Sequence, residues 1–371
     1  MTLPIRQATN ILITGAGGRI GRQVVTSLQS TGHTVYQIRS GASKTAKPNP
    51  LIHHELDPSS LTMSQWQQKM RENNIQIVLN LAAQSSGCPK AMEAVNVKMP
   101  QTIAKACEGL GIKMIHTCSY SAHLKGLTTE DHPYAATKQI AAKTLESEPH
   151  VVIARLGAVL GGQSDVPVIS DAAVSKWSPV ILLPAAGGEQ VIHPVDEKTV
   201  VKAMQGIVEH LTDPAKESQP LPKVIDIAGQ EVPLKAFLKM INPKALGSVK
   251  LPNIVLNLLS ILVDKGVFTK EFMNIAKLIS SRDSEQVKPD TTVMENVLGV
   301  ITPSPEKVAD AAREQLSLLQ TTSIIAKSVL NKIINQIPSK AREPSWPANF
   351  LTQIKNVEGI AQGISKKPSN L

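Results

Sequence analysis

The chain has few cysteines, few aromatic residues and no long apolar run. Its three cysteines, Cys88, Cys107 and Cys118, are too few and too scattered for a disulfide framework or a zinc site, so we expect a reducing compartment. The most apolar helical run, residues 254–263, falls well short of the roughly 20 residues that cross a bilayer. The N-terminal segment lacks the apolar core of a signal peptide. We therefore expect a cytoplasmic protein without a transmembrane segment.

The basic net charge is weak support for a nucleic-acid partner, because the chain has few aromatic residues and much of the charge lies at one end. The formal net charge is +9, but only ten residues are Phe, Trp or Tyr, which leaves little for base stacking. Residues 321–371 hold seven basic and two acidic residues, so +5 of the +9 lies in this tail. The nine histidines form no clear cluster with acids, so we predict no catalytic metal.

A glycine-rich motif follows the first apolar segment. Residues 11–14, ILIT, read as a strand; Gly15, Gly18 and Gly21 come next, and Arg22 to Ser30 has helical character. Such glycines let the chain bend sharply and let a pyrophosphate approach the N-terminus of the new helix. The motif predicts a phosphate-binding turn, with an ordinary strand-to-helix turn as the alternative.

Strand and helix patterns then alternate along the chain. We expect strands over residues 34–38, 51–56, 75–81 and 113–117, and helices over 60–72, from 91 and over 101–108. This alternation predicts an α/β fold, a Rossmann-type doubly wound parallel sheet with a small substrate-binding lobe and a helical C-terminal extension. We divide the chain into a dinucleotide-binding domain (1–235, with 163–192 contributing to the substrate lobe), a mainly helical substrate lobe (236–315) and a basic amphipathic tail (316–371).

The end of the second predicted strand bears on cofactor choice. In a dinucleotide fold an acid there bonds the ribose of NAD, whereas a cation pairs with the 2′-phosphate of NADP. Arg39 stands at this point, and Lys44 and Arg19 add positive charge. We therefore expect NADP as the preferred cofactor, or NAD if Arg39 is only a solvated loop residue.

A tyrosine and a lysine form the second chemical signal. Tyr134 follows Pro133 at a predicted helix start, and Lys138 lies four residues later on the same helix face. An ammonium near a phenol lowers the phenol pKa, so the pair can exchange a proton with a hydroxyl or carbonyl. A serine hydroxyl from the preceding strand end can hold the same oxygen. An exposed helix with an accidental Tyr/Lys pair is the alternative.

Several segments together resemble one family. They are TGAGGRIG (14–21), NLAA (80–83), AVNV (94–97), HTCS (116–119), YAATK (134–138), ARLGAVLGG (154–162), LPAAGGEQVIHPVD (183–196), VIDIAGQEVPLKAFLKMI (224–241) and LGVITPSPEKV (298–308). In this order they resemble the extended short-chain dehydrogenase/reductase family, often called the NAD-dependent epimerase/dehydratase family. The resemblance covers roughly residues 8 to 312 and leaves the tail uncovered.

The resemblance implies a role for each matching residue. Ser119 would orient the substrate oxygen, Tyr134 would be the acid/base, Lys138 would tune Tyr134 and bond the nicotinamide ribose, and Asn96 would support Lys138 through water. The cofactor-binding set that we expect is Gly15, Gly17, Gly18, Arg19, Ile20, Gly21, Arg39, Asp57, Leu81, Ala82, Ala83, Tyr134 and Lys138.

The chain also departs from the family pattern. Cys118 replaces the first serine of the usual pair. Tyr120 and Ser121 stand where the sugar-nucleotide 4,6-dehydratases carry the Asp-Glu pair used for elimination, which argues against dehydration. His193, at the returning strand, is expected to be structural.

Two functions remain open at this point. The first is an NAD(P)-dependent oxidoreductase or epimerase-like enzyme that transfers hydride at a carbinol or carbonyl carbon of a small molecule whose identity the sequence does not give. The second is a catalytically silent NAD(P)-binding regulatory or assembly protein whose tail binds a partner. For the tail, packing on the domain, an oligomer surface such as a homodimer, and contact with a membrane surface all stay open.

Overall fold

The computed structural model describes residues 8–40, 52–55, 57–85, 88–123, 128–129, 132–160, 180–183, 188–250 and 288–318. Expectations for Lys44, for helices within 251–279 and for the tail from residue 319 onward lie outside these residues.

The first half of the chain alternates strands and helices, as expected. Its elements are β1 (Asn10–Thr14), α1 (Arg19–Ser30), β2 (Thr34–Ser40), β3 (Ile52–Glu55), η1 (Pro58–Ser60), α2 (Met63–Glu72), β4 (Ile77–Asn80), α3 (Pro89–Glu93), the π-helical turn η2 (Ala94–Lys98), α4 (Met99–Glu108), β5 (Lys113–Ser119), η3 (Tyr120–His123), α5 (Pro133–Glu146) and β6 (Val151–Leu156).

The second half adds shorter elements. They are β7 (Ala158–Leu160), β8 (Val180–Leu183), β9 (Val191–Ile192), β10 (Pro194–Asp196), α7 (Glu197–Thr212), η4 (Pro214–Lys216), β11 (Val224–Ile227), β12 (Val232–Pro233), α8 (Leu234–Ile241), β13 (Gly247–Lys250), α11 (Thr292–Asn296) and α12 (Pro305–Leu318).

A seven-stranded parallel sheet organises these elements, in the order β11-β6-β5-β4-β1-β2-β3. The chain runs outward from β1 through β2 to β3 and then returns to the other side of β1 with β4. Ligands of such sheets bind at this reversal, beyond the carboxyl ends of the strands. The doubly wound parallel fold predicted from the sequence is therefore confirmed.

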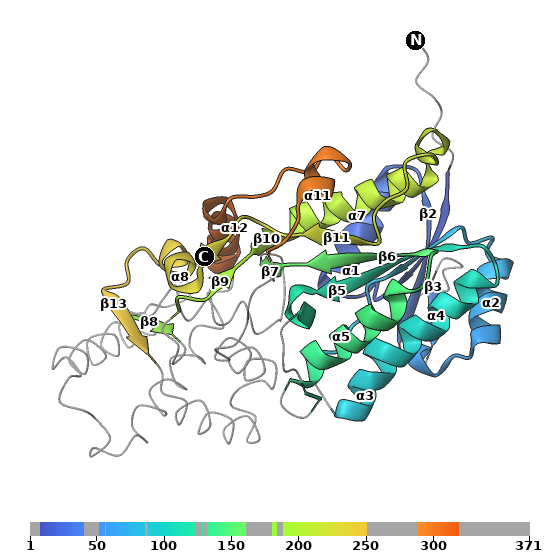
Figure 1. Ribbon diagram of the computed structural model, residues 1–371, viewed down its shortest axis with the longest axis horizontal. Coiled ribbons are helices and arrows are strands. Elements are labelled where there is room, and N and C mark those ends of the chain that lie inside the picture. Colours follow the sequence, from blue (N-terminus) through green and yellow to red (C-terminus); the bar gives the residue numbers. More distant parts are fainter. Residues whose placement is uncertain are drawn as a thin grey trace, which may run out of the picture.

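Helices cover both faces of the sheet (Figure 1). On one face α1 and α7 pack on β1, β6 and β11, with Val24, Leu28 and Met204 fully buried. On the other face α2, α4 and α5 pack around Trp66, Ile103 and Leu145. Because both faces are covered, the central strands β1, β4 and β6 are largely apolar.

Residues after β11 return to the sheet. Met294 of α11 and Val300 belong to the same core as β1 and α1, while Val308, Ala309 and Ala312 of α12 pack against Phe237 of α8. The described parts of region 236–315 thus lie in two places: α8 and α12 pack together beside the small strands, and α11 packs on the sheet (Figure 1).

The predicted helix over residues 60–72 begins later than expected. Thr62 forms a capping box with Gln65, each side chain bonding the other residue's backbone N–H, so α2 starts at Met63. The preceding residues form η1, whose start is capped by Asp57.

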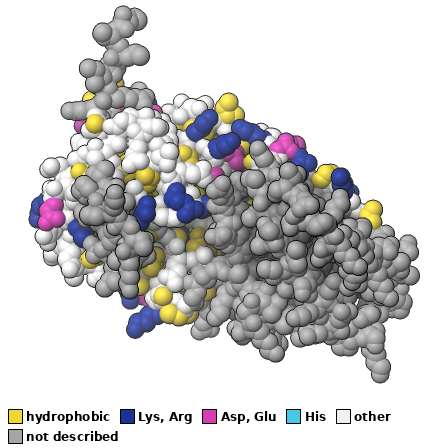
Figure 2. Space-filling view, turned by 180° about the vertical axis from the view of Figure 1, so that it is seen from behind, with side chains coloured by type: hydrophobic (Ala, Val, Ile, Leu, Met, Phe, Trp, Pro, Cys, Tyr) yellow, Lys and Arg dark blue, Asp and Glu magenta, His cyan; other side chains and the backbone are white. Residues whose placement is uncertain are grey.

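The described surface carries charges of both signs. On the face in Figure 2, basic and acidic side chains are interspersed. In the part of the chain that the structure describes, no helix is both long enough and apolar enough to cross a membrane. The same part contains no group of three or more His, Cys, Asp or Glu side chains placed to hold a metal ion.

Candidate active site

The glycine turn between β1 and α1 is packed against the loop after β4. Gly15 has φ +70°, and a Cβ added there would lie 2.6 Å from the Ala82 nitrogen. A Cβ at Gly21 would collide with the Gly15 carbonyl oxygen, whereas one at Gly17 would meet no atom within 4 Å. Glycine is therefore required for the fold at Gly15 and Gly21, and Gly17 leaves open backbone surface. These features fit a turn that receives a pyrophosphate.

A buried polar network lies beneath this turn. Thr14 Oγ1 donates to Asn80 Oδ1, and Asn80 Nδ2 donates to His116 Nδ1 at 2.9 Å, so the imidazole is neutral with its proton on Nε2. That Nε2 atom is buried and has no hydrogen-bond partner among the described residues. Burial, with the charge of Lys138 as a second cause, lowers the pKa of His116 well below its usual value. The network joins β1, β4 and β5 at the sheet's reversal point.

Asn96 enters the site from a π-helical turn. Its side chain accepts from the Gln84 N–H at 2.8 Å and donates to the Gln84 carbonyl at 2.9 Å and to Thr137 Oγ1 at 3.0 Å. The turn, Ala94–Lys98, interrupts the helix between α3 and α4, and such turns often occur at functional sites. Asn96 therefore links the loop after β4 to the helix that carries Tyr134 and Lys138, without a direct bond to Lys138 in this structure.

Tyr134 and Lys138 lie one turn apart on α5. Lys138 is 2% exposed, and its Nζ donates to the Thr117 carbonyl of β5 at 2.8 Å. Burial lowers the pKa of Lys138. The expected lowering of the Tyr134 pKa by Lys138 is not found here: burial, with Cys118 nearby, raises the pKa of Tyr134 to about 12. At neutral pH the phenol is thus a proton donor.

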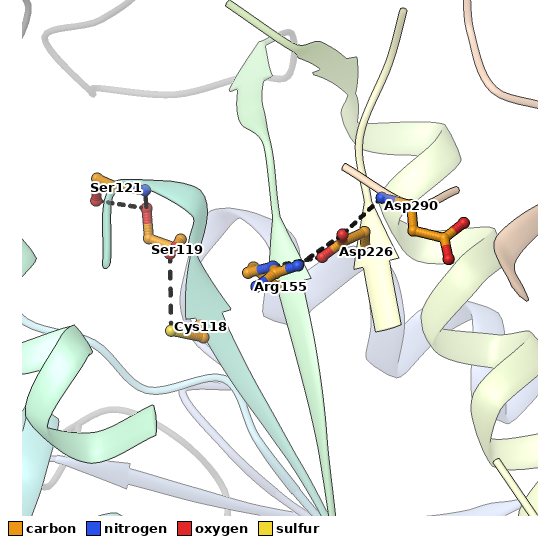
Figure 3. Close-up of polar contacts among 6 residues, drawn as sticks. All are labelled: Cys118, Ser119, Ser121, Arg155, Asp226 and Asp290. Atoms are coloured by element: carbon orange, nitrogen blue, oxygen red, sulfur yellow. Dashed lines mark hydrogen bonds and ion pairs between the residues drawn. The ribbon is translucent and has the colours of Figure 1, made fainter. Parts of the chain in front are cut away.

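Ser119 ends β5 and begins a tight turn. Its Oγ lies 2.8 Å from Ser121 Oγ and accepts the Ser121 N–H at 3.3 Å (Figure 3). The preceding Cys118 is buried, which raises the pKa of its thiol despite nearby Lys138 and Arg155. The catalytic serine expected from the sequence is therefore held by its own turn.

Three of the expected cofactor residues make other contacts. Arg19 Nε pairs with Glu197 at 2.7 Å, and Nη2 of Arg19 donates to the Val159 carbonyl at 3.3 Å. Asp57 caps η1 by accepting the Ser59 N–H at 3.0 Å. Arg39 Nη2 donates to Gln37 Oε1 at 2.5 Å, and its Nε is buried without a hydrogen bond to a described residue.

The remaining expected cofactor residues surround the glycine turn. Ile20 packs partly buried against the core, Leu81 and Ala82 are partly buried beside Gly15, and Ala83 is exposed. The Leu81 N–H donates to the Thr14 carbonyl at 3.2 Å, which fixes the loop after β4 against β1.

Sequence reasoning missed a charged pair beside the serine turn. Arg155 of β6 bonds Asp226 of β11 through two hydrogen bonds, and its Cζ lies 5.0 Å from the Tyr120 ring centroid. The sequence did contain a signal for this pair. Each of the two apolar strands, VVIARL and VIDI, carries one charged residue, and a buried charge needs a partner of opposite sign.

The His193 ring packs beside Tyr120, which contacts this pair. Its ring centroid is 5.7 Å from that of Tyr120, and its carbonyl accepts the Ala158 N–H at 3.1 Å. Burial lowers the pKa of His193.

Several solved structures share this fold. The UDP-bound and NAD-bound enzyme WbmG of Bordetella bronchiseptica superposes with a TM-score of 0.61 at 15% identity, covering 87% of this chain and 98% of that one. The UDP-glucuronic acid 4-epimerase of Bacillus cereus, in complex with UDP-glucuronic acid and NAD, gives 0.58 at 17% identity over 84% and 100% of the chains.

A third structure is the dTDP-glucose 4,6-dehydratase of Bacillus anthracis in complex with NAD. It gives a TM-score of 0.58 at 15% identity, covering 87% of this chain and all of that one. At such low identities the likeness establishes the fold. No curated protein matches the sequence.

The family comparison agrees with the resemblance seen in the motifs. Residues 11–175 match the model of the NAD dependent epimerase/dehydratase family, a span that runs from β1 past β7 and includes the glycine turn, Asn96, Ser119, Tyr134 and Lys138. Residues 11–175 are therefore similar to the NAD-dependent epimerase/dehydratase family, and the Rossmann-like parallel sheet agrees with this similarity.

Proposed function

We propose that this protein is an NAD(P)-dependent oxidoreductase or epimerase-like enzyme acting at a carbinol or carbonyl carbon. The observation that carries the proposal is the convergence of two distant motifs at one sheet edge. The glycine turn follows β1, while Lys138 is anchored to the end of β5 through the Thr117 carbonyl, two strands away in the sheet. A dinucleotide laid along that edge would reach from the first motif to the second.

The chain's own groups divide the chemistry between them. A bound nicotinamide supplies the hydride donor or acceptor. Tyr134, protonated at neutral pH, gives its proton to a developing alkoxide, and Ser119 donates a hydrogen bond to the same oxygen. In the reverse direction Tyr134 must first lose its proton, so the Lys138 ammonium must turn from Thr117 toward the phenol.

NADP use is the finer part of the proposal and depends on Arg39. The Nε of Arg39 is buried and makes no hydrogen bond to a described residue. Arg39 is the next-to-last residue of β2, which pairs with β1, the strand that leads into the glycine turn. A guanidinium in this place suits a 2′-phosphate. The similar structures named above contain NAD, so the two cofactors must be compared directly.

The test begins with cofactor titration. NADH and NADPH are titrated into the full chain by nucleotide fluorescence, and the expected result is saturable binding, tighter for NADPH. Arg39→Gln should remove the difference between the two nucleotides. Equal affinities in the wild type would overturn the NADP preference, and no binding of either would overturn the proposed function.

Turnover is measured next with UDP- and dTDP-sugars, because the similar structures include enzymes named for such compounds. Epimerisation is followed by chromatography and redox change by nicotinamide absorbance.

A second function is favoured by one observation. Lys138 is engaged by the Thr117 carbonyl and the Tyr134 pKa is raised to about 12, a resting state in which the pair does not form a phenolate. A cofactor-binding regulatory or assembly protein would keep this state with cofactor bound. Binding of nicotinamide nucleotide without turnover across a broad carbonyl and carbinol panel would support it.

A further inference from the structure

Three side chains form a row across the carboxyl ends of β5, β6 and β11. The strand register pairs Cys118 with Arg155, and Arg155 with Asp226, so the three lie on one face of the sheet. Asp226 is 3% exposed and accepts from Arg155 Nε at one oxygen and from Nη2, at 2.7 Å, at the other. Figure 3 shows the guanidinium directed at this carboxylate, in a two-bond geometry that fixes its plane.

The Tyr120 ring connects this pair to the serine turn. Tyr120 lies between Ser119 and Ser121 in the chain, and its ring centroid is 5.0 Å from Arg155 Cζ. A guanidinium within about 6 Å of an aromatic centroid is attracted to the ring. The His193 ring lies 5.7 Å away from the same ring. Arg155 of β6 therefore holds Tyr120, the residue between the two serines, through the Tyr120 ring.

Asp226 also anchors a later segment. Its Oδ2 accepts the Asp290 N–H at 2.8 Å, at the start of the segment that forms α11 (Figure 3). The pair thus ties β6, β11 and residues 288–290 to one point next to the candidate site. Such a nearly buried ion pair contributes little net stability compared with an apolar replacement, so orientation is the better explanation for it.

We propose that Arg155 and Asp226 are positioning residues that hold the Ser119–Ser121 turn through the Tyr120 ring. The inference rests on the proposed function only in that Ser119 is taken to contact the substrate oxygen. The hold on the turn itself is measurable without substrate, because the Ser121 N–H bonds Ser119 Oγ and its hydrogen exchange reports that geometry.

The first experiment compares Arg155→Met with the wild type by hydrogen exchange of the full chain. Removal of Arg155 leaves the buried Asp226 carboxylate without its partner, so amides of β1 and α1 report a loss of global stability. Exchange of the Ser121 amide should accelerate about tenfold or more beyond those amides, while the affinity for NADH stays within about twofold. Arg313→Met is the matched control, since it removes a guanidinium from a more exposed pair with Asp310. Unchanged Ser121 exchange, or acceleration spread evenly over the chain, would overturn the proposal.

The second experiment leaves the ion pair intact and changes the ring. Tyr120→Leu should accelerate exchange of the Ser121 amide, as Arg155→Met does. Tyr120→Phe keeps an aromatic face for Arg155, so its Ser121 amide should exchange at the wild-type rate. Equal exchange in both variants would show that Arg155 does not act through the ring. If the wild type binds NADH but turns over no substrate, the proposed function fails while these exchange results still decide the positioning proposal.

Discussion

Tyr134 shows how a single residue can combine two opposing effects. The helix position puts Lys138 one turn away, which lowers a phenol pKa when the ammonium faces it. In this structure burial dominates and the Lys138 Nζ bonds a carbonyl instead. The sequence therefore identifies the residue pair, and only the side-chain geometry reveals its protonation state.

The first prediction concerns the Tyr134 hydroxyl. Tyr134→Phe removes the proton donor and leaves the ring, so kcat should fall about 10²- to 10⁴-fold while the NADH dissociation constant changes by less than about twofold. Steady-state kinetics and fluorescence titration measure the two quantities. Retention of turnover would exclude Tyr134 from the mechanism.

The second prediction concerns the glycine turn. Gly15→Ala forces a side chain into φ +70° and against the Ala82 nitrogen, so the free energy of unfolding should fall by about 1–3 kcal/mol, with loss of NADH binding. Gly17→Ala is the control, because a Cβ there meets no atom within 4 Å, and its unfolding should match the wild type within about 0.5 kcal/mol. Urea unfolding distinguishes the two; equal stability of the variants would contradict the packing described here.

Among the secondary-structure elements, the π-helical turn Ala94–Lys98 has the most direct link to the site. The turn directs Asn96 inward, where the side-chain amide of Asn96 bonds both the backbone N–H and the backbone carbonyl of Gln84. No periodicity in the sequence distinguishes this turn from an α-helix. The AVNV motif located the asparagine through a family resemblance, but its partners came from the structure.

The third prediction tests this link. Asn96→Ala leaves the Gln84 N–H and carbonyl without their side-chain partner, which should cost about 1–3 kcal/mol of unfolding free energy. Thr137→Val removes the contact of Asn96 with α5, and with it the bonds from the Thr137 hydroxyl to the Pro133 and Tyr134 carbonyls within the helix. It keeps both Gln84 contacts of Asn96 and should cost less. Chemical denaturation with a readout of NADH binding measures both variants. A smaller loss for Asn96→Ala than for Thr137→Val would contradict the role given to the Gln84 contacts.

Element boundaries illustrate what local sequence can specify. The strands of the sheet were predictable because they are buried on both faces and therefore read as apolar runs, such as residues 75–81 for β4. The start of α2 at Met63 was missed, although Thr62 and Gln65 form a recognisable capping box. The short strands β7, β9, β10 and β12 have no clear pattern, because two or three residues show no periodicity.

At the scale of the whole molecule, the sheet order brings together residues that are far apart in sequence. Thr14, Asn80 and His116 lie on β1, β4 and β5, and the reversal between β1 and β4 makes them neighbours beneath the glycine turn. The parallel sheet was predictable from alternating elements, so the position of the glycine motif and of the segment that contacts Lys138 at the carboxyl ends of β1 and β5 followed from topology. The Arg155–Asp226 pair depends on strand register, which the sequence patterns do not specify.

The last prediction concerns the pH dependence of global stability. The fold holds His116 neutral and lowers its pKa well below 6.5, mainly by burial, and the pKa of His193 is also lowered. Below its usual pKa an unfolded histidine binds a proton that the folded one does not, so stability is full above about pH 6.5 and falls as the pH decreases. Each such group contributes a slope of up to about 1.4 kcal/mol per pH unit.

The measurement compares urea unfolding of the wild type and His116→Asn between about pH 5 and pH 7.5, a range on both sides of the usual histidine pKa. Asparagine offers Asn80 an acceptor but does not titrate, so the variant should be less stable at neutral pH and lose less further stability on acidification. Burial raises the pKa of Glu197, so this residue makes the fold more stable as the pH decreases, which is opposite to the effect of His116. Because Glu197 is present in both proteins, its effect cancels when the two slopes of stability against pH are subtracted. Identical slopes would show that His116 of the folded chain takes up a proton over the same pH range as an unfolded histidine, and the lowered pKa given to this buried imidazole would then be wrong.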